Sequence, residues 1–223
     1  MLRRLLSSSS FKNCCKCIQC KGALGRGSQL IKCPACSTLQ PPPLHLADTC
    51  CPDYFRLLDL PSRFQVDTSQ LKGSFLRLQG LVHPDRVKQA GEAGGWSAWI
   101  NRAHETLKNP LSRAIYLLQQ RQKRSIENET EEIDSDDSSN NSTERISIAQ
   151  VLEVREQLDS LDPVKDAHEI ETLRQANDER IRRVVESLRV AIDEQNDLTE
   201  ARSLINELRY LISIDTAIRE VLV

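Results

Sequence analysis

Two stretches of matched helical periodicity, one on each side of a His-Pro-Asp tripeptide, constrain the fold of this 223-residue chain most strongly. In both stretches apolar residues recur at i, i+4, i+7 and i+11: Leu71, Phe75, Leu78 and Val82, then Trp96, Ile100, Ala103 and Leu107. Two helices with matched apolar stripes can bury them against each other, which predicts an antiparallel hairpin. The tripeptide is then displayed at the tip of this hairpin.

The hairpin with its tripeptide, His83-Pro84-Asp85, resembles a J domain, the module with which co-chaperones activate the ATPase of DnaK-type heat-shock chaperones. Pro84 fixes one backbone torsion and lacks a donor, so it holds the loop in one shape. Asp85 can then present its carboxylate to an arginine of the chaperone, while His83 orients the loop and contacts the partner. The resemblance also implies a basic face, although solvated helices often carry as many charges; the candidates are Lys72, Arg77, Arg86 and Lys88.

The J-like module is expected to span residues 52–124, with a short first helix at 54–58 and a fourth helix after Pro110. Asp67, followed three residues later by Gln70, predicts a capping-box-like start for the second helix. Asn109-Pro110 ends the third helix, because a residue before proline avoids helical geometry.

Charge is distributed unevenly along the chain. Residues 1–47 contain seven Lys or Arg and no Asp or Glu, and the opening MLRRLLSSSSFK predicts a mitochondrial transit peptide over 1–12, with a disordered tail as the alternative. Overall, 30 basic and 32 acidic residues nearly cancel, which gives no support to nucleic-acid binding. No apolar run approaches the roughly 20 residues that span a bilayer, so a soluble protein without membrane association is expected.

The cysteines are confined to the first 51 residues, and four of them form two Cys-x-x-Cys pairs: Cys17, Cys20, Cys33 and Cys36. Two such turns can place four thiolates at the corners of a tetrahedron, which predicts a structural zinc site within residues 13–40. Rubredoxin-like iron, redox chemistry and disulfides are the alternatives, and Cys14 or Cys15 could replace a ligand. Gly22, Gly25 and Gly27 are expected to allow the tight turns. Pro41 to Pro43 predict a stiff spacer between this knuckle and the hairpin.

An acidic, Ser- and Asn-rich segment, IENETEEIDSDDSSNNST at 126–143, predicts a flexible linker within residues 125–145. It is most simply a solvated insertion, and a regulatory phosphorylation segment is the alternative. Helical periodicity returns after it in three amphipathic segments, which predict a C-terminal bundle over 146–223. Asp162-Pro163 separates the first two helices, and Asp197 with Glu200 predicts a capping box for the third. The fold class is therefore all-α.

The order of knuckle, J domain and bundle resembles the animal mitochondrial form of the HscB family of iron-sulfur cluster co-chaperones. The most specific stretches are DYF at 53–55, LVHPD at 81–85, NRA at 101–103 with TL at 106–107, PLSRAIYLL at 110–118, EVREQL at 153–158 and LRY at 208–210. The resemblance implies that the bundle binds a cluster scaffold protein while the J domain recruits the chaperone. By alignment the scaffold-binding residues are Ile148, Leu152, Glu153, Glu156 and Tyr210. The chain departs from the family at 147–150, where SIAQ replaces a Phe-Leu-Met-Glu-like run, and in its longer acidic segment.

No nucleophile-base pair or phosphate-binding glycine loop is evident, so the chain is not expected to be an enzyme. The resemblance implies a location in the mitochondrial matrix, with an additional cytoplasmic pool as an option, and a homodimer is compatible with it. Two other functions remain open at this point. One is a general J-domain co-chaperone for unfolded clients, and the other is a small metal or electron carrier that works through the four cysteines.

Overall fold

The computed structural model describes residues 16–42, 53–83, 90–128, 152–158, 161–162 and 165–221, with backbone alone at 90–94 and 123–128. Within these residues the regular secondary structure is helical. Two isolated antiparallel β-bridges also occur, between Lys16 and Ala23 and between Lys32 and Leu39. This confirms the all-α prediction. The chain divides into two compact units, residues 1–62 with 66–108 and residues 63–65 with 109–223, which are described separately.

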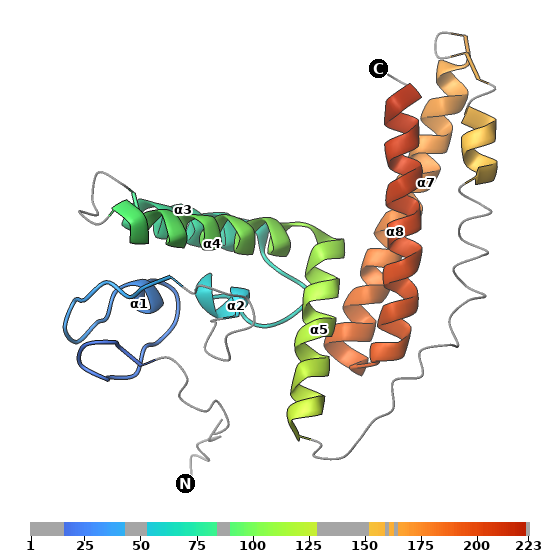
Figure 1. The fold of residues 1–223 in the computed structure, drawn as a ribbon. Coiled ribbons are helices and arrows are strands. Elements are labelled where there is room, and N and C mark those ends of the chain that lie inside the picture. The colour runs from blue at the N-terminus through green and yellow to red at the C-terminus, as the bar shows by residue number, and fades with distance from the viewer. Residues whose placement is uncertain are drawn as a thin grey trace, which may run out of the picture. The chain divides into compact units, whose positions relative to one another are not determined.

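The described part of the N-terminal unit contains four helices: α1 (Ser28–Ile31), α2 (Tyr54–Leu57), α3 (Thr68–Leu81) and α4 (Ala90–Lys108). Helices α3 and α4 lie side by side, and α2 packs against α4 (Figure 1). Asp67 caps α3, because its carboxylate accepts hydrogen bonds from the backbone N–H groups of Ser69 and Gln70. The prediction of this helix start is confirmed.

The predicted apolar stripes form the core of the hairpin. On α4 all four predicted residues are buried, and before the loop Leu71, Leu78 and Val82 are buried as well. Phe75 is only partly buried, and its ring stacks on the imidazole of His104 with a centroid distance of 4.3 Å. The hairpin predicted from the periodicity is therefore correct in its pairing and in most of its core.

The C-terminal unit contains α5 (Pro110–Asn128), a helix at 152–158, α7 (Ala167–Arg189), the π-helical η1 (Val190–Gln195) and α8 (Leu198–Val221). Helices α7 and α8 pack along each other, and α5 packs against α8 (Figure 1). Helix α5, which the sequence reading included in the J-like module, thus belongs to the second unit by its contacts.

Two sequence signals at the ends of these helices are confirmed, and one is not. Helix α4 ends at Lys108, directly before Asn109-Pro110, and the carboxylate of Asp197 accepts from the N–H of Glu200 at 3.0 Å at the start of α8. The prediction that the linker begins at Ile126 is wrong, because α5 continues to Asn128. The residues just before Ile126 include Gln, Lys and Arg, which are good helix formers, so the helix outlasts its apolar stripe. Residues 129–151 lie outside the described part.

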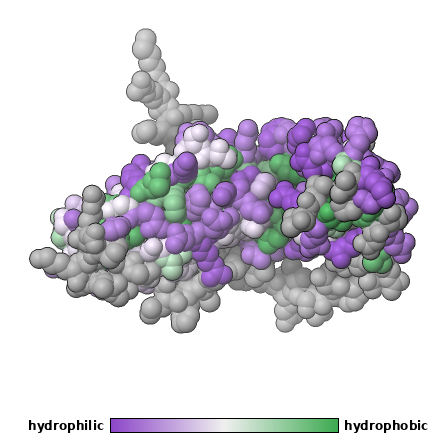
Figure 2. Space-filling view, turned by 90° about the horizontal axis from the view of Figure 1, so that it is seen from above, coloured by the Kyte–Doolittle hydropathy of each residue, from purple (hydrophilic) through white to green (hydrophobic). Residues whose placement is uncertain are grey.

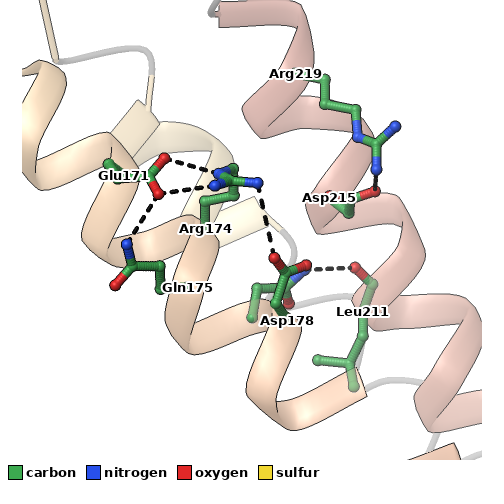
Figure 3. A network of polar contacts seen from close by, with 8 residues as sticks. Glu171, Arg174, Gln175, Asp178, Leu211, Asp215 and Arg219 are labelled. Carbon is green, nitrogen blue, oxygen red and sulfur yellow. Dashed lines mark hydrogen bonds and ion pairs between the residues drawn. The ribbon is translucent and has the colours of Figure 1, made fainter. Parts of the chain in front are cut away.

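A polar network crosses the surface of α7 (Figure 3). The carboxylate of Glu171 accepts two hydrogen bonds of 2.7 Å from the guanidinium of Arg174, which also lies 3.8 Å from a carboxylate oxygen of Asp178. Beneath it, the buried amide of Asn177 donates to the carbonyl of Leu211 on α8 at 3.1 Å. This hydrogen bond ties α7 to α8.

Segment 63–65 joins the C-terminal unit through Asp193 of η1. The carboxylate of Asp193 accepts from the backbone N–H groups of Phe64 at 2.7 Å and Gln65 at 3.0 Å, and the Arg113 guanidinium lies 4.9 Å from the centroid of the Phe64 ring. No helix in the described part of the chain is long and apolar enough to cross a membrane. The face drawn in Figure 2 is mostly hydrophilic, with smaller hydrophobic areas between the polar side chains.

Candidate metal centre and interaction surfaces

The four cysteines predicted as metal ligands come together in one cluster. The sulfur atoms of Cys17, Cys20, Cys33 and Cys36 all lie within 4.8 Å of one another. The sulfurs of Cys17 and Cys36 are 3.5 Å apart, and those of Cys20 and Cys33 are 3.7 Å apart. A tetrahedral site with metal–sulfur bonds of about 2.3 Å has sulfurs about 3.8 Å apart, so the cluster has the dimensions of a four-cysteine metal site.

Each Cys-x-x-Cys pair forms the same backbone turn. The N–H of the first cysteine donates to a carbonyl five residues later, at 2.8 Å for Cys17 and 2.9 Å for Cys33. The carbonyl of that cysteine accepts from the N–H four residues later, which belongs to Lys21 or Ser37. Lys21 and Ser37 both adopt left-handed backbone, with φ of 60° and 59°. The two pairs therefore form matched knuckles that present their sulfurs to a common point.

The prediction that glycines supply these tight turns is wrong in its detail. Left-handed backbone occurs at Lys21 and Ser37, whereas Gly22 and Gly25 do not adopt it. Gly27 has a φ of 55°, but it precedes α1 and lies outside both knuckles. The hydrogen bonds of the knuckle backbone hold the left-handed residues in place, so glycine is not required there.

The electrostatics of the cluster favour a bound cation. Hydrogen bonds with the hydroxyl and backbone of Thr38 lower the pKa of Cys36 to about 6, and the backbone N–H of Cys20 lowers the pKa of Cys17. The backbone N–H of Gly22 also lowers the pKa of Cys20. The neighbouring sulfurs have the opposite and larger combined effect, so the pKa of Cys20 is raised to about 11. Four thiols this close cannot all ionise without a compensating positive charge, and a divalent metal supplies it. Cys14 and Cys15 lie outside the described residues.

The knuckle is packed onto the hairpin unit, so the expectation of a spacer that separates them is wrong. The guanidinium of Arg56 on α2 donates to the carbonyls of Leu24 at 2.7 Å and Gly25 at 3.0 Å. The N–H of Gly27 in turn donates to the carbonyl of Arg56 at 3.0 Å. Pro42 lies against Gly95 of α4, where a side chain would come within 2.5 Å of the proline ring. Pro42 therefore lies against the hairpin instead of leading the chain away from it.

The predicted chaperone-binding residues fall partly within the described chain. His83 is exposed and follows the last turn of α3, whose C-cap is the buried Val82. Lys72 and Arg77 are also exposed on α3, but five positions correspond to about 140° around a helix axis. These two side chains therefore start from different faces of the helix. Pro84, Asp85, Arg86 and Lys88 lie outside the described residues.

Three predicted scaffold-binding residues lie together on the helix at 152–158. Leu152, Glu153 and Glu156 are all exposed and fall within an arc of about 100° around this helix, and Leu152 is 56% exposed. Tyr210 of α8 is only 9% exposed. Burial raises the pKa of Tyr210, to which the positive charge of Arg180 and the negative charge of Glu153 make smaller opposing contributions. Tyr210 therefore offers little surface for direct contact with a partner, while Ile148 lies outside the described residues.

Sequence reasoning missed two groups that the structure brings to these sites. Gln40, which is 3% exposed, reaches the sulfur of Cys17, and Arg56 binds the carbonyls of the knuckle. Neither carried a sequence signal, because one glutamine after a cysteine motif and one arginine in a short helix have many ordinary explanations.

Comparison with known proteins relates the chain to one family. Residues 148–219 match the family model of the HSCB C-terminal oligomerisation domain. The iron-sulfur cluster co-chaperone protein HscB of Homo sapiens is 30% identical over 220 residues, which cover 96% of this chain and 85% of the human protein. The crystal structure of human co-chaperone protein HscB superposes with a TM-score of 0.66 at 29% identity, covering 92% of this chain and 97% of the human one. The chaperone HscB from Vibrio cholerae has a TM-score of 0.61 at 26% identity and covers 76% of this chain and 97% of its own.

Proposed function

Because the chain belongs to the HscB family of iron-sulfur cluster co-chaperones, we propose that it promotes the transfer of iron-sulfur clusters from a scaffold protein to acceptors. The observation that carries this proposal is the 30% identity to the human relative over 96% of the chain, which includes both units. In this proposal the cluster is cargo, the C-terminal helices bind the scaffold, and the hairpin activates a DnaK-type chaperone. The reaction chemistry belongs to the chaperone, so the chain itself is not an enzyme. Its location is the mitochondrial matrix, to which the N-terminal segment directs it.

The hairpin supports the chaperone half of this proposal. Its two helices are locked together by a buried apolar seam, and His83 emerges at the end of that seam with its side chain exposed. A rigid hairpin loses little conformational entropy when it docks on a partner. The carboxylate of Asp85 then contacts a basic group on the chaperone.

The exchange Asp85→Asn tests the chaperone half. This variant should lose stimulation of the mitochondrial chaperone ATPase while its helical content and scaffold binding stay unchanged, because it removes a charge without altering shape. Single-turnover ATPase rates with and without the variant measure the effect. Near-wild-type stimulation would rule out the J-domain mechanism. An Asp→Asn exchange at Asp53 cannot serve as the control, because the side chain of Asp53 caps α2.

The exposed group on the helix at 152–158 supports the scaffold half. Leu152 offers an apolar contact, and the carboxylates of Glu153 and Glu156 flank it, as in a small interface with a hydrophobic centre and a charged rim.

Alanine at Leu152, Glu153 and Glu156 together should weaken scaffold binding by at least about tenfold, because truncation of one well-buried anchor alone can cost more than about 1 kcal/mol. Calorimetric titration with purified scaffold protein measures this. A control is Arg155→Ala, since Arg155 is exposed on the same helix but lies outside this arc. If the triple variant stays folded and binds as the wild type does, this surface is not the scaffold site.

At the cysteine cluster the proposed ion is a structural zinc held by Cys17, Cys20, Cys33 and Cys36. When bound, it cross-links the two knuckles and adds stability that the small N-terminal segment cannot obtain from its own core. Elemental analysis and an absorption spectrum distinguish the metals, because a zinc site with four cysteine ligands is colourless and a rubredoxin-like iron site is red. One zinc per chain is expected, and stoichiometric iron would favour a carrier role instead.

A further inference from the structure

Gln40 connects the two knuckles of the cysteine cluster. Its side-chain oxygen accepts from the N–H of Ile18 at 3.0 Å, and its side-chain nitrogen donates to the carbonyl of Thr38 at 2.9 Å. The same nitrogen lies 3.4 Å from the sulfur of Cys17. Ile18 belongs to the first knuckle and Thr38 closes the second, so a single buried amide bridges both and contacts a candidate ligand.

The backbone of the same residue is bound to the hairpin. The carbonyl of Gln40 accepts a buried hydrogen bond of 2.7 Å from the indole N–H of Trp96. Trp96 is 2% exposed and lies in the second turn of α4, near the N-terminal end of the helix, which follows the His-Pro-Asp segment in the sequence. Two residues further along the chain, Pro42 packs against Gly95, the neighbour of Trp96. Gln40, whose side-chain amide contacts the Cys17 sulfur, is therefore also the acceptor for a core side chain of the hairpin.

We propose that Gln40 is a positioning residue that couples metal occupancy of the cysteine cluster to the first turns of α4. The metal fixes the sulfur of Cys17, to which the amide of Gln40 donates, and so holds that amide in place. Metal also fixes the separation of the knuckles that this amide bridges. Without it the carbonyl of Gln40 loses its fixed position, and the buried indole N–H of Trp96 loses its acceptor. The start of α4 then loosens next to the loop that carries His83.

This inference rests on the zinc assignment, and it extends the proposed function: zinc loading controls how well the hairpin presents its loop. The two tryptophans of the chain, Trp96 and Trp99, both lie in α4 and are well placed to detect the effect. The ring of Trp99 contacts Tyr54 of α2 in an edge arrangement with a centroid distance of 5.9 Å, so it serves as an internal reference.

The first experiment removes zinc from the full chain with a chelator and follows hydrogen exchange of the two indole N–H groups by NMR. Exchange at Trp96 should accelerate by at least about tenfold, while backbone amides of α8 keep their protection. Addition of zinc should restore the slow exchange. Unchanged exchange at Trp96 in protein shown by elemental analysis to have lost its zinc overturns the inference, and so does general unfolding of the N-terminal unit.

The second experiment separates Gln40 from the metal itself. Gln40→Ala should retain one zinc per chain, because all four sulfurs remain, yet show fast exchange at the Trp96 indole even when loaded. Gln19→Ala is the matched control, since Gln19 lies exposed in the first knuckle and contacts the hydroxyl of Thr38 instead of α4. Equal behaviour of the two variants overturns the inference.

Coupling must also act in the reverse direction. Trp96→Phe removes the indole donor and should weaken zinc affinity by roughly fivefold in competition with a chelating dye, whereas Trp99→Phe should not. Equal affinities for both variants overturn the inference and leave the zinc assignment intact. If elemental analysis shows that the wild-type chain binds no zinc, the zinc assignment and this inference are both wrong.

Discussion

The contact between Pro42 and Gly95 allows a quantitative test of how tightly the knuckle is held on the hairpin. A methyl group at Gly95 would lie 2.5 Å from Cγ and 3.0 Å from Cβ of Pro42. Carbon atoms in contact are normally about 3.5 to 4.0 Å apart, so the proline segment would have to move by about 1 Å. Pro42 cannot turn its ring away as a flexible side chain could. Gly95→Ala therefore acts on the packing of the knuckle.

Gly73→Ala is the matched control, because Gly73 is the sixth residue of α3 as Gly95 is the sixth of α4. A methyl group at Gly73 would meet nothing within 4 Å. Both exchanges gain about 1 kcal/mol of helix propensity, whereas Gly95→Ala alone incurs an overpacking penalty of about 1 to 3 kcal/mol. The difference between the variants is that penalty, because the chemical change is the same.

The expected outcome is a raised melting temperature for Gly73→Ala and an unchanged or lowered one for Gly95→Ala, with at least about 4 °C between them. Thermal unfolding followed by tryptophan emission measures this in the N-terminal unit, since both tryptophans lie in α4. Equal stabilisation by the two exchanges would refute the close packing of Pro42 on α4. It would also weaken the case for a knuckle held against the hairpin.

Two further predictions concern the C-terminal unit. Asp193→Asn should destabilise this unit by about 1.5 to 3 kcal/mol in urea unfolding, because the charged acceptor of the Phe64 and Gln65 N–H groups is lost; wild-type stability would show that the anchor is dispensable. The hydrogen bonds from Arg174 lower the pKa of Glu171 to about 2, so the stabilisation by this pair is present above the unfolded pKa of about 4.3 and is lost as pH falls towards 2. The stability difference between wild type and Glu171→Gln, measured by urea unfolding from pH 7 down to pH 2, should shrink over that interval, and a constant difference would contradict the pairing.

The sequence predicted those features that depend on residues close together in the chain. The spacing of Leu71 and Leu78 against Ile100 and Leu107 predicted the hairpin, because a helix repeats every 3.6 residues and one apolar stripe needs a partner. Asp67 and Asp197 predicted helix starts, because a cap bonds to N–H groups two or three residues away. The four cysteines were identified for the same reason, since ligand spacing within each knuckle is local.

Contacts between distant segments were decided by the tertiary structure. Asp193 binds backbone N–H groups that lie 129 and 128 residues away, and the Gln40 carbonyl binds an indole 56 residues away. A hydrogen bond to a backbone group does not depend on the side chain of the residue that supplies this group, so such pairs have no sequence pattern. The prolines after Gln40 illustrate the same limit, because they determine that the chain is extended and not what it lies against. The sequence by itself thus determined most of the helices, several of their caps and the cluster of four cysteines, while the packing of the knuckle on α4 depended on complementary surfaces that form only when the whole unit folds.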